Sequence, residues 1–297
     1  MVKVLVVGVA VLDFIFDVET FPTSPDKYRA LDARIVNGGN AANASIAISR
    51  LGGEAVLCAR TGTDVVSDVI VSGLKSQGVD CSCVRQFDDN RASFSSIYID
   101  PSGERQIVNY RDNSLTKSAD WLAELVPDDV DIVLSETRWP EGAKFAMQLA
   151  RDRGIPGIMD GEVPVFEGEE AIRLASHVAF SANAVMQFTG RETVEEAVLS
   201  AGKVLEGMVF ATDGERGVFW DEDGKVRNSS SFPVTPVDTL GAGDVWHGAF
   251  ALKLGSSEPL ENTVRYASAA AALKCERVGG GSGAPTADEV ATFLEKF

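Results

Sequence analysis

One short segment near the C-terminus combines acidic side chains with a run of small residues. It reads Asp238-Thr239-Leu240-Gly241-Ala242-Gly243-Asp244, and an apolar helical pattern follows over Val245–Leu254. Small residues at a helix start let backbone N–H groups approach an anion, and the helix dipole favours negative charge there. Asp244 would then either cap the helix or take a proton from a hydroxyl group that attacks a phosphoryl group. The spacing alone leaves both roles open.

A second segment, Gly38-Gly39-Asn40-Ala41-Ala42-Asn43, opens an Ala-rich helical pattern. Its glycines permit close approach of the backbone, and the carboxamides of Asn40 and Asn43 are able to hydrogen-bond sugar hydroxyl groups. The alternative is a tight turn with an asparagine cap. By itself this segment is a weak signal.

The elements that must position these segments alternate along the chain. Continuous apolar, β-branched runs are typical of strands covered on both faces, and they occur at Val2–Val9, Ala55–Arg60, Val130–Ser135, Gly157–Met159, His177–Phe180 and Met208–Ala211. Helical patterns lie between and after them, at Ala41–Leu51, Ser67–Gln77, Glu141–Arg153, Thr193–Leu205, Ala249–Leu254, Leu260–Lys274 and Ala287–Lys296. The alternation predicts an α/β fold with three layers (α/β/α) and a mainly parallel central sheet.

Two insertions interrupt this alternation, with strand-like composition and turn signals but no helical period. We expect residues 1–13, 37–90 and 112–297 to form the α/β core, and residues 14–36 and 91–111 to form a small β-sheet lid over the carboxyl ends of the strands. In the second insertion, Ser93–Asp100 and Arg105–Tyr110 flank a turn as the strands of a hairpin would. The alternative is two unrelated surface hairpins.

Charge and composition exclude several classes of partner. The 297 residues carry a formal net charge of −17, which disfavours binding to nucleic acid or to anionic lipid. No apolar run approaches the length of a bilayer span, and the chain opens on a strand pattern, so we expect a cytoplasmic protein. The four cysteines lack zinc-ligand spacing, and two histidines make His-centred catalysis a poor hypothesis.

Taken together, the two segments resemble the ribokinase-like (PfkB) family of carbohydrate kinases. The resemblance extends over nearly the whole chain and includes the turns Gly103-Glu104-Arg105 and Thr212-Asp213-Gly214-Glu215-Arg216-Gly217. It implies a ribokinase-like fold and a kinase that transfers the γ-phosphoryl group of ATP to a hydroxymethyl group of a sugar, a sugar-like alcohol or a nucleoside. The transfer would be in line and governed by positioning and electrostatics, with the lid excluding water.

The resemblance also assigns roles to particular residues. Asp244 would be the base, and the amides of Gly241, Ala242 and Gly243 would stabilise charge on the transferred phosphoryl group. The sugar-binding positions would be Asp13, Gly39, Asn40 and Asn43. Nucleotide contacts would come from Thr212, Gly214, Thr239, Ala271, Gly279 and Gly281.

Cations and one departure from the family pattern follow from the same resemblance. Mg²⁺ would accompany ATP, held largely through water, with Asp160 and Glu162 as candidates, and a monovalent cation such as K⁺ would lie beside the loop at Asp238. The N-x-x-E motif of the family is absent, because Ser181 and Ala184 occupy its two defining positions. This substitution puts the usual magnesium and phosphate water network in doubt.

The identity of the sugar depends on three dispersed side chains. Lys27, Asn109 and Arg138 would form a clamp for an anionic substrate if they converged, and each alone would otherwise be a solvated surface group. Segments around them resemble a bacterial branch of the family, the 6-deoxy-6-sulfofructose kinases, whereas the GGN-x-x-N turn is closer to ketohexokinases. We therefore expect a ketose phosphorylated at O1, with sulfofructose as one candidate, and plain fructose, ribose or another sugar as the alternative. Relatives often dimerise through the lid, which leaves a homodimer open.

Two other classes of function remain as alternatives. A catalytically silent sugar-binding protein on the same scaffold would fit the missing N-x-x-E motif, although the intact Gly241–Gly243 loop and Asp244 speak against it. A dinucleotide-dependent dehydrogenase is disfavoured, because no G-x-G-x-x-G spacing follows the first strand at Gly8.

Overall fold

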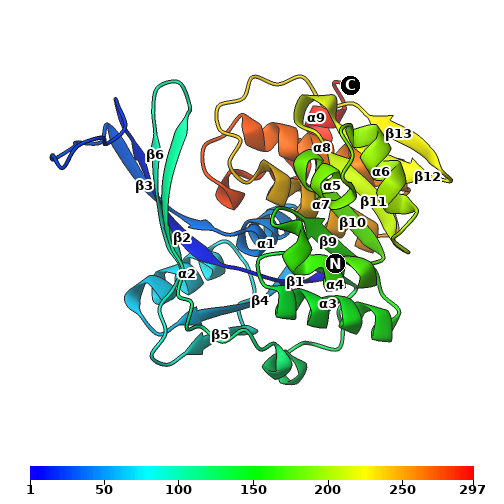
Figure 1. Cartoon of the computed structure of the whole chain (residues 1–297), viewed down its shortest axis with the longest axis horizontal. Helices are drawn as coiled ribbons and strands as arrows, with labels where there is room; N and C mark the ends of the chain where they lie inside the picture. The colour runs from blue at the N-terminus through cyan, green and yellow to red at the C-terminus, as the bar shows by residue number, and fades with distance from the viewer.

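Two sheets of different size organise the chain, and the computed structural model describes all residues, 1–297 (Figure 1). The larger sheet has nine strands in the order β13-β12-β11-β10-β9-β8-β1-β4-β5. All strands from β11 to β5 run parallel; β12 is antiparallel to both of its neighbours, so it alone runs in the opposite direction. The strands are β1 (Lys3–Val7), β4 (Glu54–Gly62), β5 (Val84–Phe87), β8 (Ile132–Glu136), β9 (Gly157–Gly161), β10 (His177–Ser181), β11 (Met208–Thr212), β12 (Val218–Glu222) and β13 (Lys225–Ser229).

Helices cover both faces of this sheet, and the alternation of side chains along β1 shows why. Val4 and Val6 belong to one apolar core, whereas Leu5 and Val7 belong to the other. The first core is closed by α1 (Asn40–Arg50), α2 (Val65–Ser76), α7 (Ala242–Gly255), α8 (Leu260–Cys275) and α9 (Ala287–Leu294). The second is closed by α3 (Pro140–Arg153), α4 (Glu169–Leu174), α5 (Ala182–Thr189) and α6 (Val194–Gly202). The predicted α/β fold with a mainly parallel sheet is confirmed.

The smaller sheet has four strands in the order β3-β2-β6-β7 and stands beside the α/β body (Figure 1). Its strands are β2 (Val11–Asp17), β3 (Asp32–Gly38), β6 (Phe94–Ile99) and β7 (Arg105–Tyr110). A separate small sheet built from both insertions was predicted, and β6 and β7 form the predicted hairpin. The strands of the first insertion extend to Val11 and Gly38, beyond the predicted limits of 14 and 36.

The register places side chains of different character on the two faces of the small sheet. Asp13 is paired with Ser95, and Ser95 with Asn109, so these three side chains share one face. On the opposite face, Ile35 and Val108 lie in one row across Phe14 and Ser96, and both are 62% exposed. The polar face is the one that bears on ligand binding.

Several elements were not predicted, and the reasons are local. The strands β5, β12 and β13 are short and partly exposed, so they lack a continuous apolar run. The helices α4 and α5 have six and eight residues, too few for a clear helical period. Single 3₁₀ turns occur at Asp120–Glu124, Val165–Gly168, Gly214–Arg216 and Gly281–Gly283. None of the helices combines the length and the apolar character that a bilayer span requires.

Candidate active site

The candidate site lies where the parallel strands of the large sheet end. Glu136 is the last residue of β8, Asp160 lies near the end of β9, Ser181 ends β10 and Thr212 ends β11. In an open parallel sheet, the carboxyl ends of neighbouring strands form one edge at which ligands bind. Polar side chains from four strands are therefore gathered at this edge, next to the N-terminus of α7.

The N-terminus of α7 presents unpaired backbone amides. Gly241 precedes the helix with a φ of 75°, a conformation that strongly favours glycine. No protein group accepts a hydrogen bond from the amides of Gly241, Gly243 or Asp244, and the space beside the Gly243 Cα is open. The amide of Ala242, by contrast, donates to the carbonyl oxygen of Thr239 at 3.2 Å. The amides of Gly241, Gly243 and Asp244 are therefore free to bind an anion, whereas the Ala242 amide is engaged by the protein in this structure, and its predicted role stays a prediction.

Asp244 does not cap the helix. The N-cap is Gly241, no side chain bonds to the first turn of α7, and the Asp244 Oδ2 instead accepts a hydrogen bond from the Asn43 Nδ2 at 2.7 Å. Burial and the nearby carboxylate of Asp160 raise the pKa of Asp244 to about 7. A carboxylate with a pKa near neutrality is suited to accept a proton from a substrate hydroxyl group.

Asn43 connects the base to a neighbouring loop. While its Nδ2 donates to Asp244, its Oδ1 accepts from the amide of Gly281 at 2.8 Å, and the residue is only 5% exposed. The carboxamide is therefore engaged by the protein on both sides. In this structure it holds the Asp244 carboxylate, and its contact with the sugar stays a prediction.

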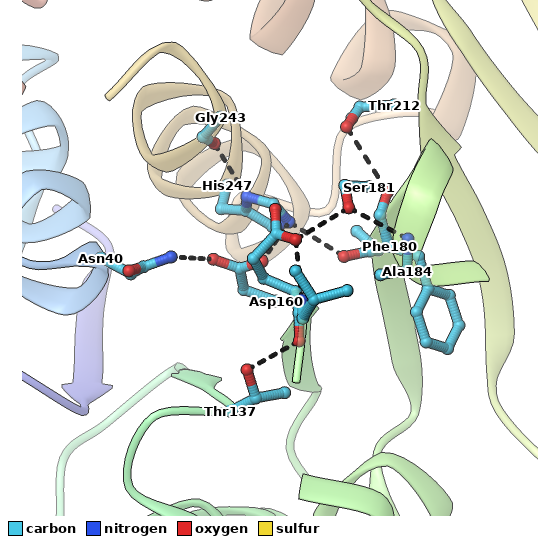
Figure 2. Close-up of polar contacts among 12 residues, drawn as sticks. Asn40, Thr137, Asp160, Phe180, Ser181, Ala184, Thr212, Gly243 and His247 are labelled. Atoms are coloured by element: carbon cyan, nitrogen blue, oxygen red, sulfur yellow. Dashed lines mark hydrogen bonds and ion pairs between the residues drawn. The ribbon is translucent and has the colours of Figure 1, made fainter. Parts of the chain in front are cut away.

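His247, one helical turn after Asp244, is buried among backbone carbonyl groups. Its Nδ1 lies 2.8 Å from the oxygen of Gly243, and its Nε2 lies 3.1 Å from the oxygen of Ala179 and 3.6 Å from Asp160 Oδ1 (Figure 2). Both ring nitrogens thus face acceptors, which leaves neither free for proton exchange with a substrate. The sequence analysis did not identify His247 as a component of this site.

Two further carboxylates face the same region. Asp160 Oδ2 accepts from the Asn40 Nδ2 at 3.1 Å, and Glu162 Oε1 accepts from the hydroxyl group of Ser181 at 3.1 Å (Figure 2). Ser181 also caps α5 by accepting from the Ala184 amide. Glu162 thus lies against the position where the family motif has its asparagine, while Asn183 is exposed. No group of three His, Cys, Asp or Glu side chains is arranged to hold a metal ion.

A cavity of about 610 Å³ adjoins the amides of α7. Four of the predicted nucleotide-contact residues line it: Thr212, Gly214, Thr239 and Ala271. Gly279 and Gly281 are not among the lining residues, and their amides donate to Asp238 and Asn43; their contacts with the nucleotide stay a prediction. The apolar walls were not predicted and are formed mainly by Val218, Phe232, Pro233, Val234 and Trp246.

The polar face of the small sheet forms the opposite boundary of the site. Asp13 is 8% exposed, and burial raises the pKa of its carboxyl group. A Cβ atom at Gly38 would lie 2.1 Å from Asp13 Oδ2. Gly39 has a φ of 93°, and a Cβ atom there would lie 2.5 Å from the carbonyl oxygen of Val9. The two glycines therefore let the turn before α1 pass directly beside Asp13. Asn109 donates to Ser95 Oγ at 3.2 Å in the same row.

Arg138 and Lys27, two residues of the predicted anion clamp, lie in different parts of the fold. Arg138 follows β8, is half-buried and forms no ion pair; its amide donates to the buried Glu136, and its carbonyl oxygen accepts from the Arg111 Nη2 at 2.9 Å. Lys27 lies in the exposed loop between β2 and β3, at the end of the small sheet away from the α/β body (Figure 1). Within one chain, Lys27 is therefore not brought to Arg138.

Comparisons with known proteins place the sequence and the overall fold in one family. The family model for pfkB family carbohydrate kinases matches residues 1–287. The ribokinase of Haemophilus influenzae is 24% identical over 98% of this chain and 97% of its own length, and the ketohexokinase of Mus musculus is 26% identical over 92% and 96%. A crystal structure from Agrobacterium tumefaciens, provisionally described as a ribokinase, superimposes with a TM-score of 0.91 at 35% identity, covering 99% of this chain and 97% of that one. The chain belongs to the PfkB family of carbohydrate kinases.

Proposed function

We propose that this ATP-dependent sugar kinase phosphorylates O1 of a ketose that carries an anionic group at its far end, with 6-deoxy-6-sulfofructose as the favoured substrate. Kinase activity follows from membership of the family and from the names of its relatives, ribokinases, fructokinases and ketohexokinase. The choice of sugar and the roles of individual residues are our proposal. The observation that carries the choice is the half-buried, unpaired Arg138 at the ligand-binding edge of a strongly acidic protein.

In the proposed mechanism, Asp244 accepts the proton of the attacking hydroxyl group. Asn43 holds its carboxylate, and burial keeps its pKa close to neutrality. As the phosphoryl group moves from ATP to the sugar, negative charge is stabilised by the amides of Gly241, Gly243 and Asp244 at the positive end of α7. General-base assistance contributes roughly 10²–10⁴ to such a rate.

The nucleotide would occupy the cavity beside α7, with its base between the apolar walls and its phosphates toward the free amides. Bound Mg²⁺ would neutralise phosphate charge, and Glu162 and Asp160 fit a contact to it through water. Glu162 Oε1 accepts from Ser181 and from the Val163 amide, which leaves Oε2 without a protein donor, and Asp160 Oδ2 keeps a lone pair after accepting from Asn40.

At the sugar end, Asp13 and Asn109 would bind hydroxyl groups, and Arg138 would bind the distal anion. A guanidinium group can form two parallel hydrogen bonds to an oxyanion, which makes it more selective than a lysine. Arg111, held against the Arg138 carbonyl, adds a second positive charge nearby. Lys27 would join this group only if the loop between β2 and β3 moved toward the core.

A neutral sugar such as fructose or ribose is the second candidate. Two observations favour it: Lys27 is exposed in the loop between β2 and β3, and curated relatives include ribokinases and fructokinases. In this case Arg138 would contact a hydroxyl group or solvent.

The experiment that separates these candidates is ADP release with Mg·ATP, measured by a coupled assay on sulfofructose, fructose, fructose 6-phosphate and ribose. The proposal predicts the highest kcat/KM for sulfofructose. A preference for fructose or ribose would retain the kinase and reject the anionic substrate. Sugar binding without turnover of any member of the panel would instead indicate a silent sugar-binding protein.

A further inference from the structure

A lysine is completely buried beneath the loop that presents the anion-binding amides. Lys274, near the end of α8, has an exposed fraction of 0%. Its Nζ donates to the carbonyl oxygen of Asp238 at 2.7 Å and lies 3.6 Å from Asp238 Oδ2. Lysine is almost never fully buried unless it is paired, because loss of hydration is costly for an ammonium group. Asp238 is the partner that makes this burial tolerable.

Asp238 is itself the point at which several segments meet. Its Oδ1 accepts from the amide of Leu240 at 2.8 Å, and its Oδ2 accepts from the amide of Gly279 at 3.0 Å. Arg105, from the small sheet, lies 3.6 Å from Oδ1 and also donates to Thr239 Oγ1 at 3.1 Å. The conformation of the segment leading to Gly241 therefore depends on Asp238 and on the cations around it.

We infer that Lys274 is a positioning residue for the anion-binding loop and that its ammonium group serves as a built-in monovalent cation at Asp238, so that turnover requires no free K⁺. This inference rests on the proposed role of the Gly241, Gly243 and Asp244 amides. The ammonium is covalently attached, so its occupancy does not vary with the salt present.

The residues around Asp238 leave no site for a free cation in addition to the Lys274 ammonium group. Both carboxylate oxygens and the carbonyl oxygen already accept from Leu240, Gly279 and Lys274. A free ion close enough to contact these oxygens would lie within a few ångströms of the Lys274 ammonium and the Arg105 guanidinium. Repulsion between like charges at such a distance, in a partly buried setting, is strong. The predicted potassium site therefore disagrees with the charges that the structure places there.

The first test uses the unmodified protein. With a sugar that the protein phosphorylates, kcat is measured in potassium, sodium and choline chloride. The ionic strength is kept equal, so that electrostatic screening is constant. We expect the three values to agree within about two-fold, as they would if no ion-specific site exists. A strong requirement for K⁺ overturns the inference.

The second test compares two substitutions of the same residue. Lys274→Ala leaves room for a small cation, whereas Lys274→Met fills the space with an apolar chain. We expect both to lose roughly 10²-fold in kcat, the scale of losing one group that stabilises the transition state. NH₄⁺ or K⁺ should restore only Lys274→Ala, by about ten-fold or more. Equal behaviour of the two variants, or no loss in either, contradicts the inference.

Thermal unfolding provides a readout that does not depend on activity. The Tm of Lys274→Ala should rise in ammonium or potassium chloride relative to choline chloride, whereas the Tm of the unmodified protein and of Lys274→Met should not respond. Lys253→Met, at a half-buried lysine on α7, is the matched control. If no sugar is turned over, the proposed function fails while the Tm comparison still decides the inference. If Lys274→Ala does not fold, the salt series on the unmodified protein decides it.

Discussion

The phosphate end and the sugar end of the site are built in different ways. At the phosphate end, Asp244, Asn43 and Asp238 are fixed by hydrogen bonds within the α/β body. At the sugar end, Asn109 and Arg138 come from different sheets and are only partly covered. Under the proposed assignment, phosphoryl transfer depends on residues that bond to one another within the α/β body, whereas the selection of substrate depends on residues from separate elements.

The largest effect should come from Asp244→Asn, which keeps the shape of the side chain but removes the base. We expect kcat to fall by about 10³-fold, within the range for loss of general-base assistance. The Kd values of ATP and sugar should stay unchanged, measured by calorimetry. Asp68→Asn, at a carboxylate on α2, is the control. Parallel losses of binding and rate would mark Asp244 as a structural residue.

A smaller loss should follow from Asn43→Ala. Removing a hydrogen bond to a charged group costs about 1.5–3 kcal/mol, or roughly 10- to 150-fold in kcat. The Asn43 bond lowers the pKa of Asp244, so its removal should move the acidic limb of the pH–rate profile to higher pH. Asn37→Ala, which removes a bond to the Ile70 carbonyl, controls for loss of a buried amide. If the acidic limb of the pH–rate profile does not move in Asn43→Ala, Asn43 does not set the pKa of the base.

Arg138→Ala tests the sugar end. We expect kcat/KM for sulfofructose to fall roughly 10- to 150-fold, equivalent to about 1.5–3 kcal/mol for a charged hydrogen bond. The value for fructose should change little, because fructose offers no anion to the guanidinium group. Arg85→Ala, at an arginine stacked on Phe87, serves as the control. Equal losses for both sugars would eliminate the anion clamp.

Lys27→Ala should have the smallest effect. An exposed side chain without a partner contributes little, so we expect kcat/KM for sulfofructose to change by about two-fold or less. An effect as large as that of Arg138→Ala would show that the loop between β2 and β3 reaches a site during turnover. In that case all three residues of the predicted anion clamp would contact the substrate at the sugar end.

The same contrast explains what the sequence could predict. The apolar runs of β1, β8 and β10 predicted strands of the sheet, and the Asp238–Asp244 segment predicted the helix start at α7, because these features are continuous in sequence. The engagement of Gly279 by Asp238 and of Gly281 by Asn43 could not be predicted, since it depends on contacts between residues far apart in the chain. The buried pair Lys274–Asp238 spans 36 positions, and no local pattern marks it.

The most direct test of the account is the pH dependence of kcat for the unmodified protein at saturating sugar and Mg·ATP. Asp244 must be ionised to accept a proton, and burial raises its pKa to about 7. The account therefore predicts a rate that climbs as the pH increases through neutrality and levels off above it. A rate that stays constant down to pH values near the ordinary pKa of an aspartate, about 4, would contradict Asp244 as the base.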